Sequence, residues 1–138
     1  MGAYLNVHEG PQGIGIRPRH GDMGFKPGMT TSNEPGYYKD GEYGIRIENV
    51  CLTVEVPHSS FPMLCSASVT GGKSFLELET VTMCPLDRKL INTSLLSGAE
   101  VQWVDTYHTR VRAALLTGMS EQFPEAVQYL LENTEPLL

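Results

Sequence analysis

The sequence is poor in positive charge and has no long apolar run, and each shortage excludes a class of protein. Ten lysine and arginine residues stand against sixteen aspartate and glutamate residues, which gives a net charge of −6 over 138 residues. Nucleic acid and anionic membranes are bound through clustered basic side chains, so this composition excludes both as partners. No run of 18 apolar residues and no basic segment followed by an apolar one is present. We therefore expect neither a membrane span nor a signal peptide.

Cysteine pairs are also missing. Cys51, Cys65 and Cys84 are an odd number at wide spacing, without a Cys-x-x-Cys motif. This usage fits a reducing compartment better than a disulfide framework or a zinc site. We expect buried thiols in a cytoplasmic protein.

What is abundant is glycine, and most of it lies early in the chain. Ten of the fourteen glycines fall within the first 44 residues, which predicts a turn-rich region with short extended pieces. Residues 43–56 (YGIRIENVCLTVEV) alternate and are rich in β-branched side chains, so they predict a strand, and residues 74–85 predict a second one. The residues between them, 58–73, are expected to form a surface connection.

The last third of the chain has a helical period. Ser97 and Glu100 match a capping box, in which the two side chains satisfy each other's backbone amides. A helix of about 18 residues should follow, and a second helix should begin near Pro124 and end around residues 133–136. The apolar positions of the first helix are Val101, Val104, Tyr107 or His108, Val111 and Leu115. Strands first and helices last predict an α+β chain.

Two carboxylates are related by a turn. Asp40-Gly41 is a strong turn signal, and Glu34 and Glu48 lie seven residues on either side of Gly41. A hairpin centred there would bring both carboxylates to neighbouring strands. Period-two alternation puts Arg46 and Glu48 on one face, with Glu48 expected inside the sheet. Two carboxylates held together need a proton, a cation or a metal ion.

Spacing alone leaves the role of these groups open. Carboxylate and imidazole ligands suit manganese, magnesium or zinc, but from spacing alone a salt-bridged hairpin surface in water is the favoured interpretation of Glu34 and Glu48. His8 is likewise either a functional group or a hydrogen-bonded structural residue. The glycine-dense residues 10–15 lack the Lys-Ser/Thr of a phosphate loop, so we interpret them as an ordinary loop.

Three segments, in this order, resemble the aminopeptidase P family of X-Pro aminopeptidases, which belongs to the creatinase and methionine-aminopeptidase ("pita-bread") superfamily. They are YLNVHEGP at Tyr4–Pro11, EPGYY at Glu34–Tyr38 and GIRIEN at Gly44–Asn49. The C-terminal part, with Trp103-Val104, Tyr107-His108 and Glu135-Pro136, resembles the extension of the long members of the family.

The resemblance implies a role for each matching residue. Glu34 and Glu48 would be two of five ligands to a pair of divalent metal ions, with manganese expected, and Glu48 would bridge both ions. Glu34 would also move a proton during catalysis, while His8 would contact the substrate and stabilise developing charge. Arg46 and Tyr38 would brace the metal site through hydrogen bonds. The substrates implied are peptides with proline in the second position, and the assembly implied is a homodimer.

The match to the family pattern is partial. The other three ligands, two aspartates and a histidine, stand upstream in the family, and the histidine's position falls before Met1. We therefore expect the C-terminal half of a pita-bread metallopeptidase domain over residues 1–86, with an antiparallel, curved sheet, and a helical C-terminal extension over residues 87–138. A fragment of this kind should have negligible peptidase activity alone. The alternative is a non-catalytic interaction or dimerisation module with a half pita-bread fold.

Overall fold

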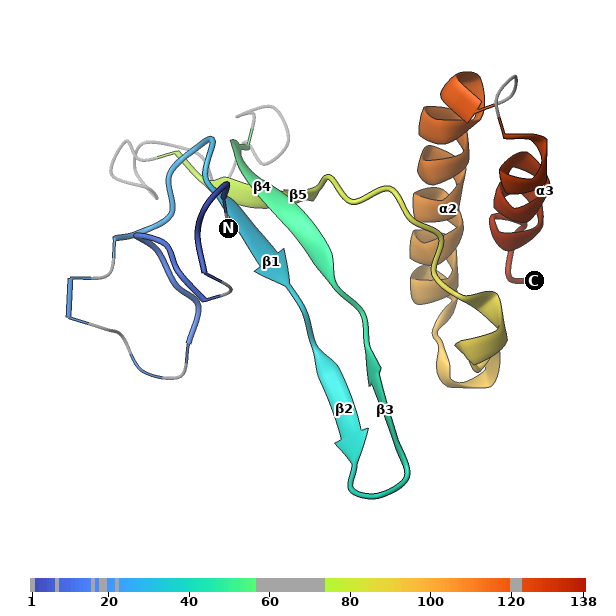
Figure 1. Cartoon of the computed structure of the whole chain (residues 1–138), viewed down its shortest axis with the longest axis horizontal. Coiled ribbons are helices and arrows are strands. Elements are labelled where there is room, and N and C mark those ends of the chain that lie inside the picture. The colour runs from blue at the N-terminus through green and yellow to red at the C-terminus, as the bar shows by residue number, and fades with distance from the viewer. Residues whose placement is uncertain are drawn as a thin grey trace. The chain divides into compact units, whose positions relative to one another are not determined.

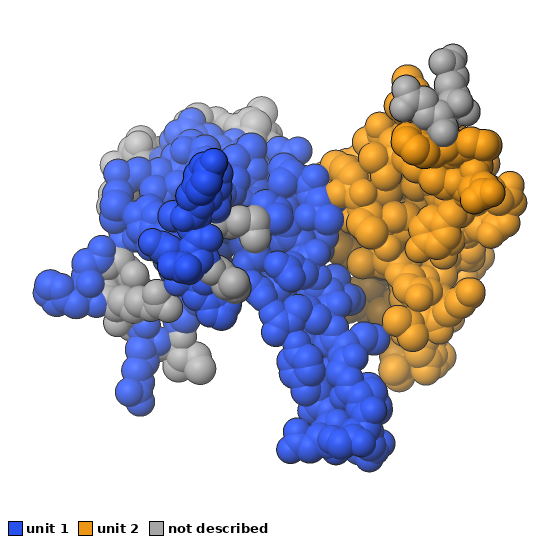
Figure 2. Space-filling view, viewed as in Figure 1, with its two compact units in different colours: residues 1–82 blue, residues 83–138 orange. Residues whose placement is uncertain are grey.

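The chain folds as two compact units, residues 1–82 and residues 83–138, which Figure 2 shows in two colours. The computed structural model describes residues 2–6, 8–15, 17, 20–21, 23–56, 74–119 and 123–138. The predicted surface connection over residues 58–73 and the thiol of Cys65 lie outside the described residues.

The described residues of the first unit form two antiparallel sheets. Strand β1 (Thr30–Asn33), β4 (Asn49–Glu55) and β5 (Leu76–Thr80) form a three-stranded sheet in the order β1-β4-β5, and β2 (Gly36–Lys39) pairs with β3 (Tyr43–Arg46). Figure 1 shows that β1 runs on into β2 and β3 into β4, so the two sheets share one long hairpin.

The hairpin is centred where the sequence predicted. Lys39 pairs with Tyr43 at its tip, and the carbonyl of Lys39 accepts a hydrogen bond from the Glu42 amide at 3.0 Å. Gly41 closes this turn with φ of +72°, a backbone conformation that other residues seldom adopt. The predicted hairpin is therefore confirmed.

The predicted strand over residues 43–56 is interrupted, and Pro35 on the opposite arm explains why. In the structure β3 ends at Arg46 and β4 begins at Asn49. The amide of Ile47 donates to the Pro35 carbonyl at 3.2 Å. Because proline has no amide proton, the return hydrogen bond of that pair cannot form, and the ladder is broken at this point.

Little of the first unit is buried among the residues described. Cys51 and Thr53 on β4, together with Val56 just after it, are buried, whereas every residue of β2 and β3 is exposed. The second predicted strand is present as β5, over Leu76–Thr80. Burial of Cys51 agrees with the expectation for the thiols, but Cys84 is exposed, which corrects that expectation.

The second unit is a helical pair. Helix α2 spans Gly98–Met119 and α3 spans Pro124–Asn133, and Figure 1 shows them side by side. The capping box is confirmed, because the Glu100 carboxylate accepts from the Ser97 amide at 2.7 Å and the Ser97 hydroxyl accepts from the Glu100 amide at 3.3 Å. Two short 3-10 helices precede α2, at Arg88–Leu90 and Thr93–Leu95.

The core of the second unit combines apolar packing with two polar anchors. Val111 and Leu130 are almost fully buried, and Tyr107 packs with them. The Tyr107 hydroxyl donates to the Cys84 carbonyl at 2.8 Å, and His108 Nε2 accepts from the Leu86 amide at 3.1 Å. Both aromatic side chains that the sequence offered as alternatives are thus buried, because the segment before the first 3-10 helix is bound to α2. The predicted α+β order is confirmed.

No helix among the described residues is long and apolar enough to cross a membrane.

Candidate functional site

Glu34 and Glu48 lie opposite each other in the hairpin. Asn33 pairs with Asn49 and Gly36 with Arg46, and two residues of each arm lie between these pairs. Glu34 therefore falls opposite Glu48, next to the pair in which Ile47 bonds to Pro35. Since hydrogen-bonded and non-bonded pairs alternate in an antiparallel ladder, the two glutamates form a non-bonded pair, whose side chains lie closest.

The exposure of the two carboxylates differs from the expectation. Glu34 is half-buried, with 24% of its side chain exposed, but Glu48 is exposed rather than inside the sheet. The two-stranded arm has no further strand or helix packed on it among the described residues, and this accounts for the exposure of Glu48.

Both carboxylate oxygens of Glu34 have partners. The Ser32 hydroxyl donates to Oε1 at 2.7 Å, and the Arg46 guanidinium forms an ion pair with Oε2. These contacts hold the pKa of Glu34 below its ordinary value, with the Ser32 hydroxyl as the largest cause and the charges of Arg46 and His8 adding to it. The carboxylate is therefore ionised and oriented, which is the state that a metal ligand requires.

Arg46 also connects Glu34 to Tyr38. Its Nε donates to the Tyr38 hydroxyl at 2.7 Å, and its guanidinium carbon lies 5.7 Å from the centre of the Tyr38 ring. The ring lies directly over Gly36 and Gly44, where an added Cβ would come within 2.6 Å and 2.5 Å of Tyr38 atoms. These two glycines are needed because any side chain there would displace the tyrosine.

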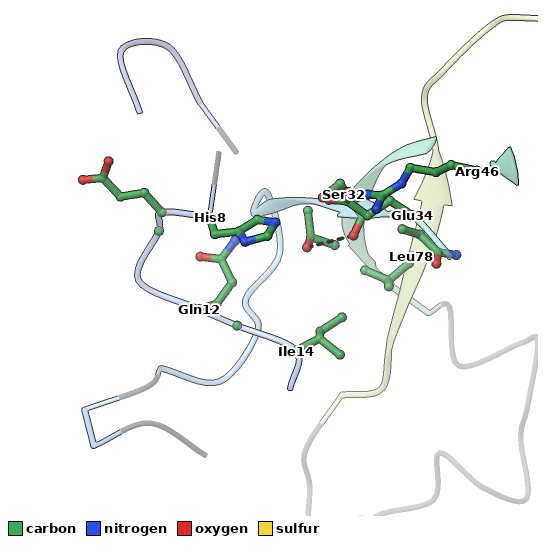
Figure 3. Close-up of a pocket in the computed structure, with 12 residues that line it drawn as sticks. His8, Gln12, Ile14, Ser32, Glu34, Arg46 and Leu78 are labelled. Carbon is green, nitrogen blue, oxygen red and sulfur yellow. Dashed lines mark hydrogen bonds and ion pairs between the residues drawn. The ribbon is translucent and has the colours of Figure 1, made fainter. Parts of the chain in front are cut away.

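His8 faces this network across a cleft of about 590 Å³ in the first unit. Figure 3 shows His8 and Gln12 on one wall and Ser32, Glu34 and Arg46 on the other. The cleft is thus lined by an imidazole, a carboxylate and a guanidinium from separate parts of the chain. Of the five residues singled out from the sequence, His8, Glu34 and Arg46 line the cleft and Tyr38 is bonded to Arg46. Glu48 lies opposite Glu34 in the hairpin but does not line the cleft.

Two residues of the cleft were not anticipated. The sequence does not single out Ser32, because a serine in a strand carries no signal of its own, although its position two residues before Glu34 places both on one face. Gln12, whose amide donates to the Thr30 carbonyl at 2.9 Å, could not be found from spacing. Within the described ranges, no three histidine, cysteine, aspartate or glutamate side chains gather closely enough to hold a metal ion by themselves.

Two family models match this chain. The model of metallopeptidase family M24 matches residues 1–55, and the model of the C-terminal region of peptidase M24 matches residues 74–137. The chain belongs to the M24 metallopeptidases. Within them it is similar to the Xaa-Pro aminopeptidases P.

Similar proteins include fungal relatives and one solved structure. A probable Xaa-Pro aminopeptidase P of Coprinopsis cinerea is 44% identical over 99% of this chain and 21% of that protein. A second, from Laccaria bicolor, is 47% identical over 99% of this chain and 20% of that protein. The crystal structure of X-prolyl aminopeptidase from Caenorhabditis elegans, described as a cytosolic enzyme with a di-nuclear active site, matches with a TM-score of 0.74 and 34% identity. That match covers 96% of this chain and 20% of the other.

These matches confirm the family and the fold. The antiparallel sheets followed by helices are those of the C-terminal part of the pita-bread fold, as the sequence predicted. The chain spans about a fifth of the length of the curated relatives it matches.

Proposed function

We propose that this chain supplies part of a dinuclear, metal-dependent aminopeptidase that hydrolyses the N-terminal X-Pro peptide bond. The observation that carries the proposal is the hairpin register, which sets Glu34 opposite Glu48 beside a cleft that His8 also lines. The similarity to Xaa-Pro aminopeptidases P supports the reaction and the substrate class.

The donor set fits a divalent metal ion. Glu34 is ionised and fixed by Ser32 and Arg46, and Glu48 acts electrostatically on the same arginine. Two adjacent carboxylates supply oxygen ligands of the kind that manganese prefers. Glu34 and Glu48 would hold part of a two-metal site, and manganese is the ion we propose. When bound, the ions supply Lewis acidity and an activated water.

The chain's own residues have separate tasks in this proposal. Glu48 is a metal ligand and supplies the second carboxylate, next to that of Glu34. Glu34 is a ligand and holds or releases a proton for the leaving imino nitrogen of proline. His8, on the opposite wall of the cleft, contacts the substrate and stabilises charge that develops at the scissile bond. Arg46 and Tyr38 hold the Glu34 carboxylate in place, since an oriented ligand needs less rearrangement.

The 138-residue chain alone should be inactive on X-Pro peptides. Two glutamates provide only part of a five-ligand set, so we infer weak metal binding and negligible turnover without the remaining ligands. Purified chain supplied with Mn²⁺ should release no first residue from an X-Pro peptide above a buffer control. Metal-dependent release by chain free of host aminopeptidase would overturn this inference.

A chimera tests the site itself. In the Coprinopsis cinerea relative, the segment that matches this chain is replaced by the chain, and hydrolysis of an X-Pro peptide is measured with Mn²⁺. We expect an active chimera in which Glu34→Gln and Glu48→Gln each lower kcat/KM by at least about 100-fold, because loss of a ligand should cost at least as much as loss of a supporting hydrogen bond.

The matched control is Glu42→Gln, which removes a carboxylate at the hairpin tip that pairs with Lys39. This variant should keep the activity of the parent chimera and its bound metal, counted by elemental analysis. If Glu42→Gln lost as much activity as Glu48→Gln, or if Glu48→Gln lost none, the assignment of the metal ligands would fail.

A second candidate function is a non-catalytic interaction or dimerisation module. It is favoured by the large apolar side chains exposed on the hairpin, which are Tyr37, Tyr43, Ile45 and Ile47. Exposed apolar surface of this kind favours association with another chain. For this candidate we propose a homodimer in the cytoplasm. Sedimentation of the purified chain should then give twice the monomer mass. A monomer mass would remove the support for this candidate.

A further inference from the structure

We propose that Gln12 is a positioning residue that fastens the segment carrying His8 to β1 and so holds the imidazole opposite Glu34. This inference rests on the proposed function only for the importance of His8, and its test needs neither metal nor substrate.

The segment over residues 8–15 depends on side-chain and loop contacts for its position. It contains no helix or strand, and Gln12 is its one residue that is not exposed. A hydrogen bond from the Met23 amide to the Pro11 carbonyl at 3.1 Å links it to the following loop. The Gln12 amide links it to the sheet, by donating from Nε2 to the Thr30 carbonyl at 2.9 Å.

The Thr30 carbonyl is the natural acceptor for such a bond. Among the described strands, β1 is at the edge of its sheet. The Met29 carbonyl accepts from the Thr53 amide at 2.8 Å, so it points toward β4, and the carbonyl of the next residue points away from it. Gln12 thus takes the place that the amide of a neighbouring strand would occupy.

Packing alone does not account for a glutamine at this position. Gln12 Oε1 is buried and has no hydrogen-bond partner among the described residues. A buried acceptor without a partner is unfavourable, and a methionine of similar length would fill the same space without that cost. The feature that methionine lacks is the donor to Thr30, so the donor explains why an amide is suited to the position.

The expected consequence is a fixed width for the cleft. Gln12, His8 and Glu34 all line it, and Thr30 begins the strand that leads to Glu34. Fastening Gln12 to Thr30 therefore couples the two walls directly. Without this bond the His8 wall would be free to move while the sheet itself kept its ladder.

The test compares Gln12→Met with wild-type chain by NMR. Backbone amide exchange is followed at Met23, which reports on the loop, and at Gly28 and Thr53, whose amides donate to Thr53 and Met29 carbonyls in the sheet. The mobility of the His8 ring is measured by ¹³C relaxation. We expect exchange at Met23 to rise by about tenfold or more and the His8 ring to become more mobile, with Gly28 and Thr53 unchanged.

Two further variants make the result decisive. Gln12→Glu keeps the shape but has no donor at neutral pH, so it should loosen His8 as Gln12→Met does. Gln102→Met makes the same substitution at an exposed site on α2 and should change nothing near His8. The proposal is overturned if His8 and Met23 behave in Gln12→Met as in wild type. It is also overturned if Gly28 and Thr53 exchange faster by the same factor, since Gln12 would then support the whole sheet.

Discussion

The two units of the chain differ in where their polar groups are placed. In the second unit, polar side chains lie inside the core and bind backbone, as Tyr107 and His108 do. In the first unit, the polar side chains of the hairpin bind one another near the surface, as Glu34, Arg46 and Tyr38 do. Among the described residues, the helical pair therefore uses its polar groups to hold its core together, whereas the hairpin of the first unit presents polar groups suited to chemistry.

The largest expected effect is a loss of unfolding free energy when a cavity is created in the core of the second unit. Leu130→Ala removes a side chain that is 2% exposed, and truncation of a buried leucine costs about 2–5 kcal/mol of unfolding free energy. Trp103 is the single tryptophan and stacks on Tyr107, so its fluorescence during denaturation reports on this unit. Leu95→Ala, at a position 79% exposed, should change the unfolding free energy by no more than about 0.5 kcal/mol. Equal losses of unfolding free energy in the two variants would mean that the buried core around Leu130 does not stabilise the second unit.

A smaller effect is the loss of stability of the second unit as the pH falls. Burial lowers the pKa of His108 below its ordinary value, Arg88 and Arg112 lower it further, and Asp105 opposes them. The unfolded chain therefore takes up a proton at higher pH than the folded chain does. The contribution of neutral His108 to stability is full above about pH 6.5 and is lost as the pH falls toward the lowered folded pKa.

Denaturation at a series of pH values measures this loss. Between pH 7 and pH 5, wild type should lose stability more steeply than His108→Gln, by at most about 1.4 kcal/mol per pH unit. Glutamine can still accept from the Leu86 amide but does not titrate. Parallel curves for the two proteins would mean that His108 is not the group that responds to acid.

The smallest effect on stability is expected in the first unit. Arg46→Met removes an ion pair in which the arginine is 43% exposed, and exposed pairs contribute little to folding. The denaturation midpoint should stay almost unchanged, while the pKa of Glu34 rises but stays below its ordinary value, because the Ser32 hydroxyl still donates. In the chimera, the same variant should lose about 10–100-fold in activity. A large loss of stability together with full activity would mean that Arg46 supports the fold and not the site.

Local signals in the sequence predicted much of the fold. The Asp40-Gly41 turn, the Ser97 and Glu100 capping box and the helix that begins at Pro124 all depend on neighbours within a few residues, and each is confirmed. The 3-10 helices were not predicted, although Asp87 and Asn92 accept from amides two residues ahead and mark their starts. A helix of three residues is too short to show a periodic pattern of apolar positions in the sequence.

The site was predictable only as far as the hairpin register determines it. Counting from Gly41 placed Glu34 opposite Glu48, because an antiparallel ladder conserves that count on both arms. The exposure of Glu48, the burial of both Tyr107 and His108, and the bond from Gln12 to Thr30 depend on segments far apart in the chain. Alternation and composition carry no information about which distant segment approaches, so these features required the structure.

The hairpin turn also limits how sequences of this kind can change. Residues at the tip other than Gly41 can be exchanged with little effect so long as the two arms keep their lengths. Inserting or deleting one residue within a single arm would slide that arm by one position and turn either Glu34 or Glu48 to the other face. Among homologous proteins, length variation should therefore be tolerated at the tip and counter-selected in the arms, even at positions where the identity of the side chain is free to drift.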